Sequence, residues 1–193
     1  ELVGFGTRII SNTKLGLAAR RRDGAAADYS AMHSKWYWEI RIDKALSEHS
    51  LMAFGIATDA FNAANWIGSN DQSWGIWPYN NTKHHNDVQQ DCELSLVKGD
   101  VVSLLLDTDA RTLSIWVNGV DKGVVFRNLP EYTKFYPILN AEKDSYALVN
   151  FGQYEFKYTP PSGYIAGFGR LKDEPKERGV EIRRYCQGSQ RVA

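Results

Sequence analysis

The segment from Asp100 to Gly119, DVVSLLLDTDARTLSIWVNG, constrains the fold of this chain more than any other. Alternate positions are apolar in residues 102–106 and again in 113–117, which predicts two strands that each place one face on a core. The polar residues 107–111 between them have the composition of a turn, and Asn118-Gly119 favours a further reversal. The alternating positions are Val102, Leu104 and Leu106, then Leu113, Ile115 and Val117. The segment therefore predicts an antiparallel meander.

The same succession of short strands and turns runs through most of the 193 residues. Aromatic residues make up 12% of the chain and include six Trp and ten Tyr, a composition that suits strands. About a dozen short strands indicate one all-β sandwich. We expect this domain over residues 1–167 and a charged C-terminal extension, either a short helix or an extended tail, over 168–193.

The interpretation also makes predictions for individual segments. Residues 78–91, which are rich in Asn, are expected to form a loop. The Trp residues that fall in predicted strands are expected in the core; they are Trp36, Trp38, Trp74 and Trp116.

Several short motifs, taken in order, resemble the SPRY (B30.2-type) domain family. The segments are KWYWEI (35–40), FGIATDAF (54–61), IGSNDQSWGIW (67–77) followed by HHND, LLLDTDARTLSIWVNG (104–119), KGVVFRNLP, FYPILN and LVNFG. The resemblance covers roughly residues 9 to 164. It implies a bent two-sheet antiparallel β-sandwich, a concanavalin-like jelly roll with little helix. It also implies no catalysis and peptide recognition by loops at one end. The order of motifs is similar to that in substrate receptors of ubiquitin ligases.

Catalytic and metal-binding alternatives find little support in the residues. His84 and His85 are adjacent, which suits one ion poorly on a strand, and the alternative is that His85 hydrogen-bonds a turn. Glu39 lies in an aromatic strand and has no Glu-x-Glu partner, so a glycosidase carboxylate competes with a Glu paired to an Arg or a backbone N–H. No nucleophile–base pair or phosphate loop is recognised. We therefore expect no enzyme, no cofactor and no metal.

Composition narrows the class of partner and the compartment. The formal net charge is zero, so nucleic acid is not expected, although a local basic patch remains an alternative. No apolar run is long enough to span a membrane. Cys92 and Cys186 are expected as free thiols in a cytoplasmic, reducing compartment, unless the fold brings them together. Because the chain opens on Glu1 and not on Met, we expect it to be part of a larger protein. We also expect the isolated domain to be monomeric.

The resemblance implies that three connections meet at one end of the sandwich: Arg20 to Asp23, Ala63 to Ser69, and Ala141 to Lys143. Trp66 either anchors a ligand or plugs the end of the sandwich, and the Arg20–Arg22 run either contacts a ligand or is a solvated face. The expected partner is a protein or peptide with an acidic or Asn-rich extended segment, and stacking of RNA bases is the weaker alternative. The predicted contacts are Arg21, Arg22, Asn65, Trp66, Ser69 and Lys143, with Tyr79 at the margin.

The leading prediction of function is a non-enzymatic interaction module that recognises a short peptide or partner loop. It would belong to a larger adaptor, scaffold or ubiquitin-ligase-type protein. Two alternatives stay open. One is a carbohydrate-binding, lectin-like sandwich or a glycosidase. The other is a structural domain packed permanently in a large assembly.

Overall fold

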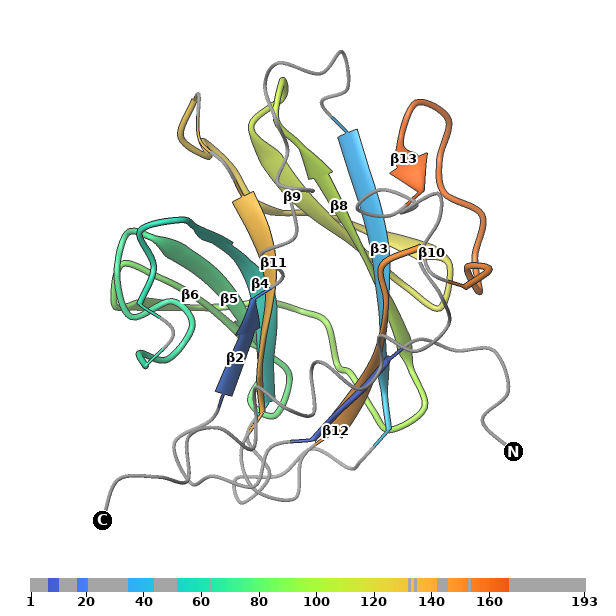
Figure 1. Ribbon diagram of the computed structural model, residues 1–193, viewed down its shortest axis with the longest axis horizontal. Coiled ribbons are helices and arrows are strands. Elements are labelled where there is room, and N and C mark those ends of the chain that lie inside the picture. The colour runs from blue at the N-terminus through green and yellow to red at the C-terminus, as the bar shows by residue number, and fades with distance from the viewer. Residues whose placement is uncertain are drawn as a thin grey trace, which may run out of the picture.

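The computed structural model describes residues 7–10, 17–20, 35–43, 52–62, 64–131, 133, 135–141, 146–152 and 154–166. For residues 7–10, 17–20, 141, 146 and 166 it describes the backbone alone. The described residues are all-β: two sheets face each other across one core, and no helix occurs among them (Figure 1). Accordingly, no helix in these ranges is long and apolar enough to cross a membrane.

The described residues form thirteen strands. These are β1 (Thr7–Ile10), β2 (Leu17–Arg20), β3 (Lys35–Ile42), β4 (Met52–Thr58), β5 (Ser73–Trp77), β6 (Thr82–His85), β7 (Val88–Asp91), β8 (Val101–Asp107), β9 (Thr112–Val117), β10 (Val120–Phe126), β11 (Phe135–Ala141), β12 (Tyr146–Asn150) and β13 (Ile165–Ala166).

The strand order defines two sheets. The first has the order β1-β12-β3-β8-β9-β10, and β13 pairs with β3 beyond the end of β12. The second has the order β2-β11-β4-β5-β6-β7. Every pairing is antiparallel except that of β13 with β3, which is parallel. The predicted two-sheet antiparallel sandwich with little helix is therefore confirmed.

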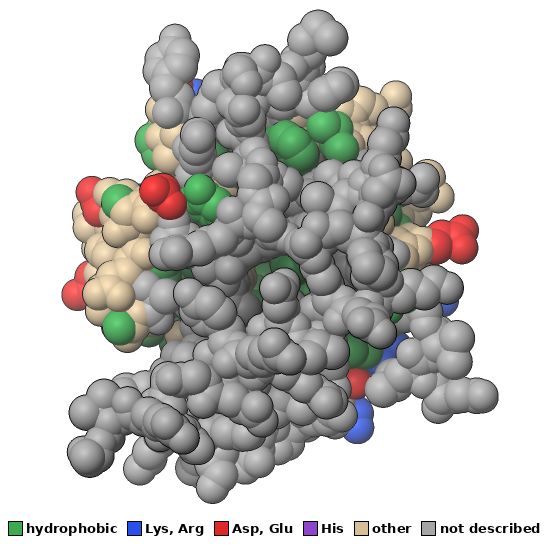
Figure 2. Space-filling model, viewed as in Figure 1, with side chains coloured by type: hydrophobic (Ala, Val, Ile, Leu, Met, Phe, Trp, Pro, Cys, Tyr) green, Lys and Arg blue, Asp and Glu red, His purple; other side chains and the backbone are tan. Residues whose placement is uncertain are grey.

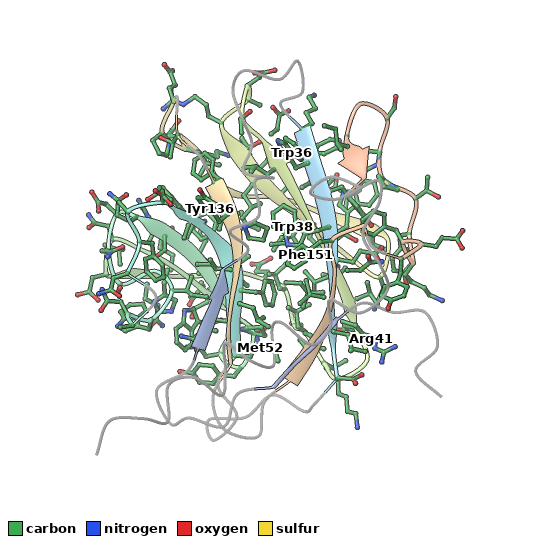
Figure 3. The ribbon with its side chains drawn as sticks, viewed as in Figure 1. Trp36, Trp38, Arg41, Met52, Tyr136 and Phe151 are labelled. Atoms are coloured by element: carbon green, nitrogen blue, oxygen red, sulfur yellow. The ribbon has the colours of Figure 1, made fainter. Side chains whose placement is uncertain are left out.

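Alternation along the strands builds the core between the sheets. Trp36 and Trp38 on β3 lie in this core, and Met52 reaches it from β4 of the facing sheet (Figure 3). Trp74 is also buried there, so three of the four predicted core Trp residues are confirmed. The fourth prediction is wrong: Trp116 is only half-buried, because β9 alternates and directs its even-numbered positions away from the core.

The predicted loop over residues 78–91 is also wrong, because β6 and β7 form a hairpin there. Asn86 and Asp87 connect the two strands with φ of 52° and 60°. Two consecutive positive φ values define the type I′ turn that matches the twist of a hairpin, and Asn and Asp tolerate them. The polar composition therefore marked an exposed edge hairpin. Residues 168–193 lie outside the described residues, so the expected C-terminal extension stays a prediction.

Candidate functional site

The connection between β4 and β5 folds back over the outer face of the second sheet. We call residues 59–72 the 59–72 loop; all but 63 are described. Ile67 is fully buried beneath it and joins a small apolar cluster separate from the main core. A Cβ on Gly75 would lie 2.6 Å from Ile67 Cγ2 and 2.8 Å from the Ile67 carbonyl oxygen. Glycine on β5 therefore makes the space that Ile67 fills.

Hydrogen bonds also tie the 59–72 loop to the sheet. The Trp77 indole Nε1–H donates to the Ile67 carbonyl oxygen at 3.1 Å. The Gly68 amide donates to Ser73 Oγ at 2.8 Å, and the Gly68 carbonyl accepts from the Asp87 amide at 2.9 Å. The loop is thus fixed both to β5 and to the turn between β6 and β7.

This anchoring gathers four aromatic side chains into what we call the aromatic ridge: Trp66, Trp77, Tyr79 and His84. The Trp66 ring centroid lies 5.9 Å from that of Trp77 and 5.5 Å from that of His84. Trp77 in turn lies 5.5 Å from His84 and 6.3 Å from Tyr79. These separations are those of edge-to-face aromatic packing. The ridge joins the 59–72 loop to the start of the hairpin.

The two ends of the ridge face solvent. Trp66 and Tyr79 are each 37% exposed, while Trp77 and His84 are partly buried between them. Burial lowers the pKa of His84 below its ordinary value of 6.5, and the nearby charge of Asp87 acts in the opposite direction. His84 is therefore neutral at pH 7, and the ridge presents uncharged aromatic surface.

The structure brings together part of the predicted site. Trp66 and Tyr79 share contacts with Trp77, and exposed Asn65 precedes Trp66 in the same loop. Ser69 belongs to this loop too, but its hydroxyl oxygen is buried. The remaining predicted contacts, Arg21, Arg22 and Lys143, lie outside the described residues and stay predictions.

The strand register bears on the expected meeting of three connections at one end. Along β4 and β11, Thr58 pairs with Phe135 and Met52 pairs with Ala141. The 59–72 loop therefore starts at one end of this strand pair, and the connection that begins at Ala141 leaves from the other end. The register of β4 and β11 therefore argues against the prediction that the 59–72 loop and the connection after β11 meet at one end of the sandwich.

The sequence interpretation did not include Trp77 and His84 in the site. Trp77 was hard to place because it ends a strand. Its outward direction follows from the inward direction of Trp74 and Ile76, both of which are buried in the main core. His84 could be placed only by recognising β6 as a strand, on which His84 and His85 face opposite sides.

His85 takes the structural role expected as the alternative to metal binding. Its Nδ1–H donates to the Ser73 carbonyl at 3.0 Å, and its ring stacks on Trp74 at a centroid distance of 4.5 Å. Ser73 is the first residue of β5, so His85 bonds the neighbouring strand and not the turn that was expected. Across the part of the chain that the structure describes, no three His, Cys, Asp or Glu side chains gather closely enough to hold a metal ion.

Glu39 is a fully buried carboxylate on the outer face of the first sheet. Its Oε2 accepts the Lys157 amide at 2.8 Å, and its Oε1 accepts the Tyr158 amide and the Tyr37 hydroxyl, both at 2.8 Å. Tyr37 also bonds Ser103 Oγ at 2.8 Å, and burial raises the Tyr37 pKa. The backbone-bonded alternative for Glu39 is therefore confirmed. Glu39 anchors residues 154–164, which we call the strap.

Comparison with known proteins agrees with this fold. The family model described as "SPRY domain" matches residues 35–154, which is more than half of the chain. The chain belongs to the SPRY domain family. Membership in this family supports the interpretation of the chain as a protein-interaction module.

Curated relatives point the same way. The chain is 30% identical over 133 residues to "F-box/SPRY domain-containing protein 1" of Drosophila willistoni, covering 64% of this chain and 51% of that protein. The same protein of Drosophila grimshawi is 29% identical over 133 residues, covering 64% and 52%. "E3 ubiquitin-protein ligase RKP" of Arabidopsis thaliana is 27% identical over 156 residues, covering 78% and 11%. The chain thus spans about half the length of the F-box/SPRY relatives and a tenth of the ligase.

Proposed function

We propose that this chain is a non-catalytic module that binds a short peptide or a loop of a partner protein through the aromatic ridge and the exposed part of the 59–72 loop. Family membership supports an interaction role, and the ridge supplies a surface for it. Glu39, the acid considered for catalysis, is fully buried and uses both oxygens to hold the strap.

One observation carries the proposal: Trp66 is 37% exposed although its neighbour Ile67 is fully buried. Ile67 anchors the backbone of the loop, and the Trp66 ring packs edge-to-face against Trp77 and His84. Binding hot spots are enriched in Trp and Tyr, and a rigid site loses less conformational entropy on association. The ridge combines both properties.

The relatives extend the proposal to the whole protein. Two are named as F-box/SPRY domain-containing proteins, and a third is named an E3 ubiquitin-protein ligase. We infer that this chain recognises the substrate or a partner subunit in a protein of the ubiquitin-ligase type in the cytoplasm. The acidic or Asn-rich partner predicted above depends on Arg21, Arg22 and Lys143, and the described residues do not carry that choice.

Removal of the Trp66 side chain tests the proposal. The chain and its Trp66→Ala variant are each screened against a displayed library of random seven-residue peptides, and the selected peptides are measured by titration. We expect Trp66→Ala to weaken binding by about 2 kcal/mol or more, with little change in the melting temperature.

Trp116→Ala is the matched control, because Trp116 is also a partly buried indole but lies on β9 of the other sheet. It should leave peptide affinity unchanged. If Trp66→Ala binds normally, or loses its melting transition together with binding, Trp66 is a packing residue and the proposed site is wrong.

A further inference from the structure

The region around the aromatic ridge is acidic although the whole chain has a formal net charge of zero. Residues 59–97 contain only one Lys or Arg, which is Lys83. Its Nζ donates to the Val125 carbonyl on β10 at 2.8 Å and lies 5.7 Å from the Phe126 ring centroid. Lys83 therefore directs its charge away from the ridge, toward the inner side of the sheet. The same stretch holds five carboxylates: Asp59, Asp71, Asp87, Asp91 and Glu93.

Three of these carboxylates are exposed on or beside the elements that carry the ridge. The backbone N–H of Asp87 donates to the Gly68 carbonyl, and the negative charge of the Asp87 carboxylate acts to raise the pKa of His84. Asp91 pairs with Thr82, which in turn pairs with Trp77, so all three share one face of the sheet. Asp71 lies in the 59–72 loop. In the space-filling view, the surface at the left, over β5 and β6, shows acidic and hydrophobic side chains and no Lys or Arg (Figure 2).

We propose that the aromatic ridge binds an extended partner segment that carries an Arg or Lys side chain. The cation would lie over the exposed ring of Trp66 or Tyr79, and Asp87 and Asp91 would supply the opposite charge. An aromatic face attracts a cation through its quadrupole, and Trp is the strongest such partner. This inference rests on the proposed function and adds the chemistry of the ligand.

The charges of the described residues around the aromatic ridge favour a cationic partner segment over an anionic one. An acidic segment on the ridge would be repelled by these exposed carboxylates, and Lys83, the one Lys or Arg of residues 59–97, directs its charge to β10 instead. A nucleic-acid backbone would meet the same repulsion. A basic segment finds both the aromatic surface and the charge complement that favour association.

Four pools of seven-residue peptides test the inference. Three pools have random neutral residues around a fixed central residue, which is Arg, citrulline or Glu. The fourth, unrestricted pool is random at every position. Retention of the 193-residue chain on each immobilised pool is measured, and the Trp66 indole N–H is followed by NMR. We expect the Arg pool to retain the chain about fivefold more strongly than the citrulline pool, which has the same shape without the charge. Added salt should remove this preference.

Charge-neutral variants locate the effect. Asp87→Asn with Asp91→Asn should abolish most of the fivefold preference, and Asn keeps the positive φ that Asp87 requires. The matched control replaces two exposed acids near the other sheet, Asp109→Asn with Glu155→Gln, and should leave the preference intact.

Equal retention on the Arg and citrulline pools, or stronger retention on the Glu pool, would overturn the inference. If the unrestricted pool then still yields ligands whose binding depends on Trp66, the proposed function is supported and only the inference of a cationic ligand is wrong. If no pool retains the chain, both are wrong. An Arg preference that survives Asp87→Asn with Asp91→Asn would also overturn the assignment to this surface.

Discussion

The strap and the 59–72 loop cover the outer faces of the two sheets by opposite means. The strap is held by polar bonds: Glu39 receives two of its amides, and Asn150 Nδ2 donates to the carbonyls of Tyr154 at 3.2 Å and Glu155 at 3.1 Å. The 59–72 loop is held mainly by an apolar side chain, Ile67, in the space that Gly75 leaves open.

The two anchors differ in what they require of the segment above them. A buried carboxylate must receive every one of its hydrogen bonds, so it fixes the backbone of the strap atom by atom. An apolar anchor requires only volume and contact, and it leaves the outward residues of the loop free to carry other functions. This difference explains why the exposed aromatic surface lies on the loop that Ile67 holds.

The largest effect is expected from Glu39→Ala. The change leaves the partly buried backbone N–H groups of Lys157 and Tyr158, and the buried Tyr37 hydroxyl, without their common acceptor. We expect a loss of about 4 kcal/mol in the free energy of unfolding, measured by urea denaturation. Loss of strap protection should accompany it in amide hydrogen exchange.

Glu155→Ala removes an exposed acid from the strap itself and should change stability by no more than about 0.5 kcal/mol. A Glu39→Ala variant as stable as this control would show that the strap does not depend on the carboxylate.

Ile67→Ala should have a smaller effect, because it removes contacts and leaves no buried polar group unsatisfied. A fully buried Ile→Ala change costs about 3 kcal/mol, and here the loss should appear in the 59–72 loop. The Trp77 indole N–H, which bonds the Ile67 carbonyl, reports on the loop by NMR. Trp66→Ala, one residue earlier, is the control and should cost less than about 1 kcal/mol. Equal losses in the two variants would contradict the division between anchor and exposed ridge.

Much of the fold was predictable because alternation is a local signal. In β3, β8 and β9, every second residue reaches the core, and the sequence shows this directly. The hairpin of β6 and β7 was not predictable in this way. All four residues of β7 are exposed, so no apolar alternation marks the strand. Trp116 was misplaced because a large aromatic side chain suits either face of a strand.

The candidate site was only partly predictable, since it depends on how a loop returns to a sheet. The sequence marks Trp66 as an aromatic residue in a polar loop, but it does not show that Ile67 is the member of the pair that is buried. Likewise, Gly75 explains the close approach of the loop only once the two segments are placed together. Long-range contact of this kind leaves no periodic pattern in the chain.

The smallest effect is expected from a change of pH. Acidification should lower the local stability of the 59–72 loop and leave that of the strap unchanged. Because burial lowers the His84 pKa below 6.5, the unfolded chain binds a proton at His84 more readily than the folded chain does. The stability that neutral His84 contributes is therefore fully present above about pH 6.5 and is lost as the pH falls through the folded-state pKa. Hydrogen exchange of the Gly68 amide reports on the loop, and that of the Lys157 amide reports on the strap. After correction for intrinsic exchange rates, acidification from about pH 7.5 to about pH 5.5 should increase opening at Gly68 and leave Lys157 unchanged. In His84→Gln, which cannot titrate, the response at Gly68 should disappear; if it persists, a group other than His84 makes the loop sensitive to acid.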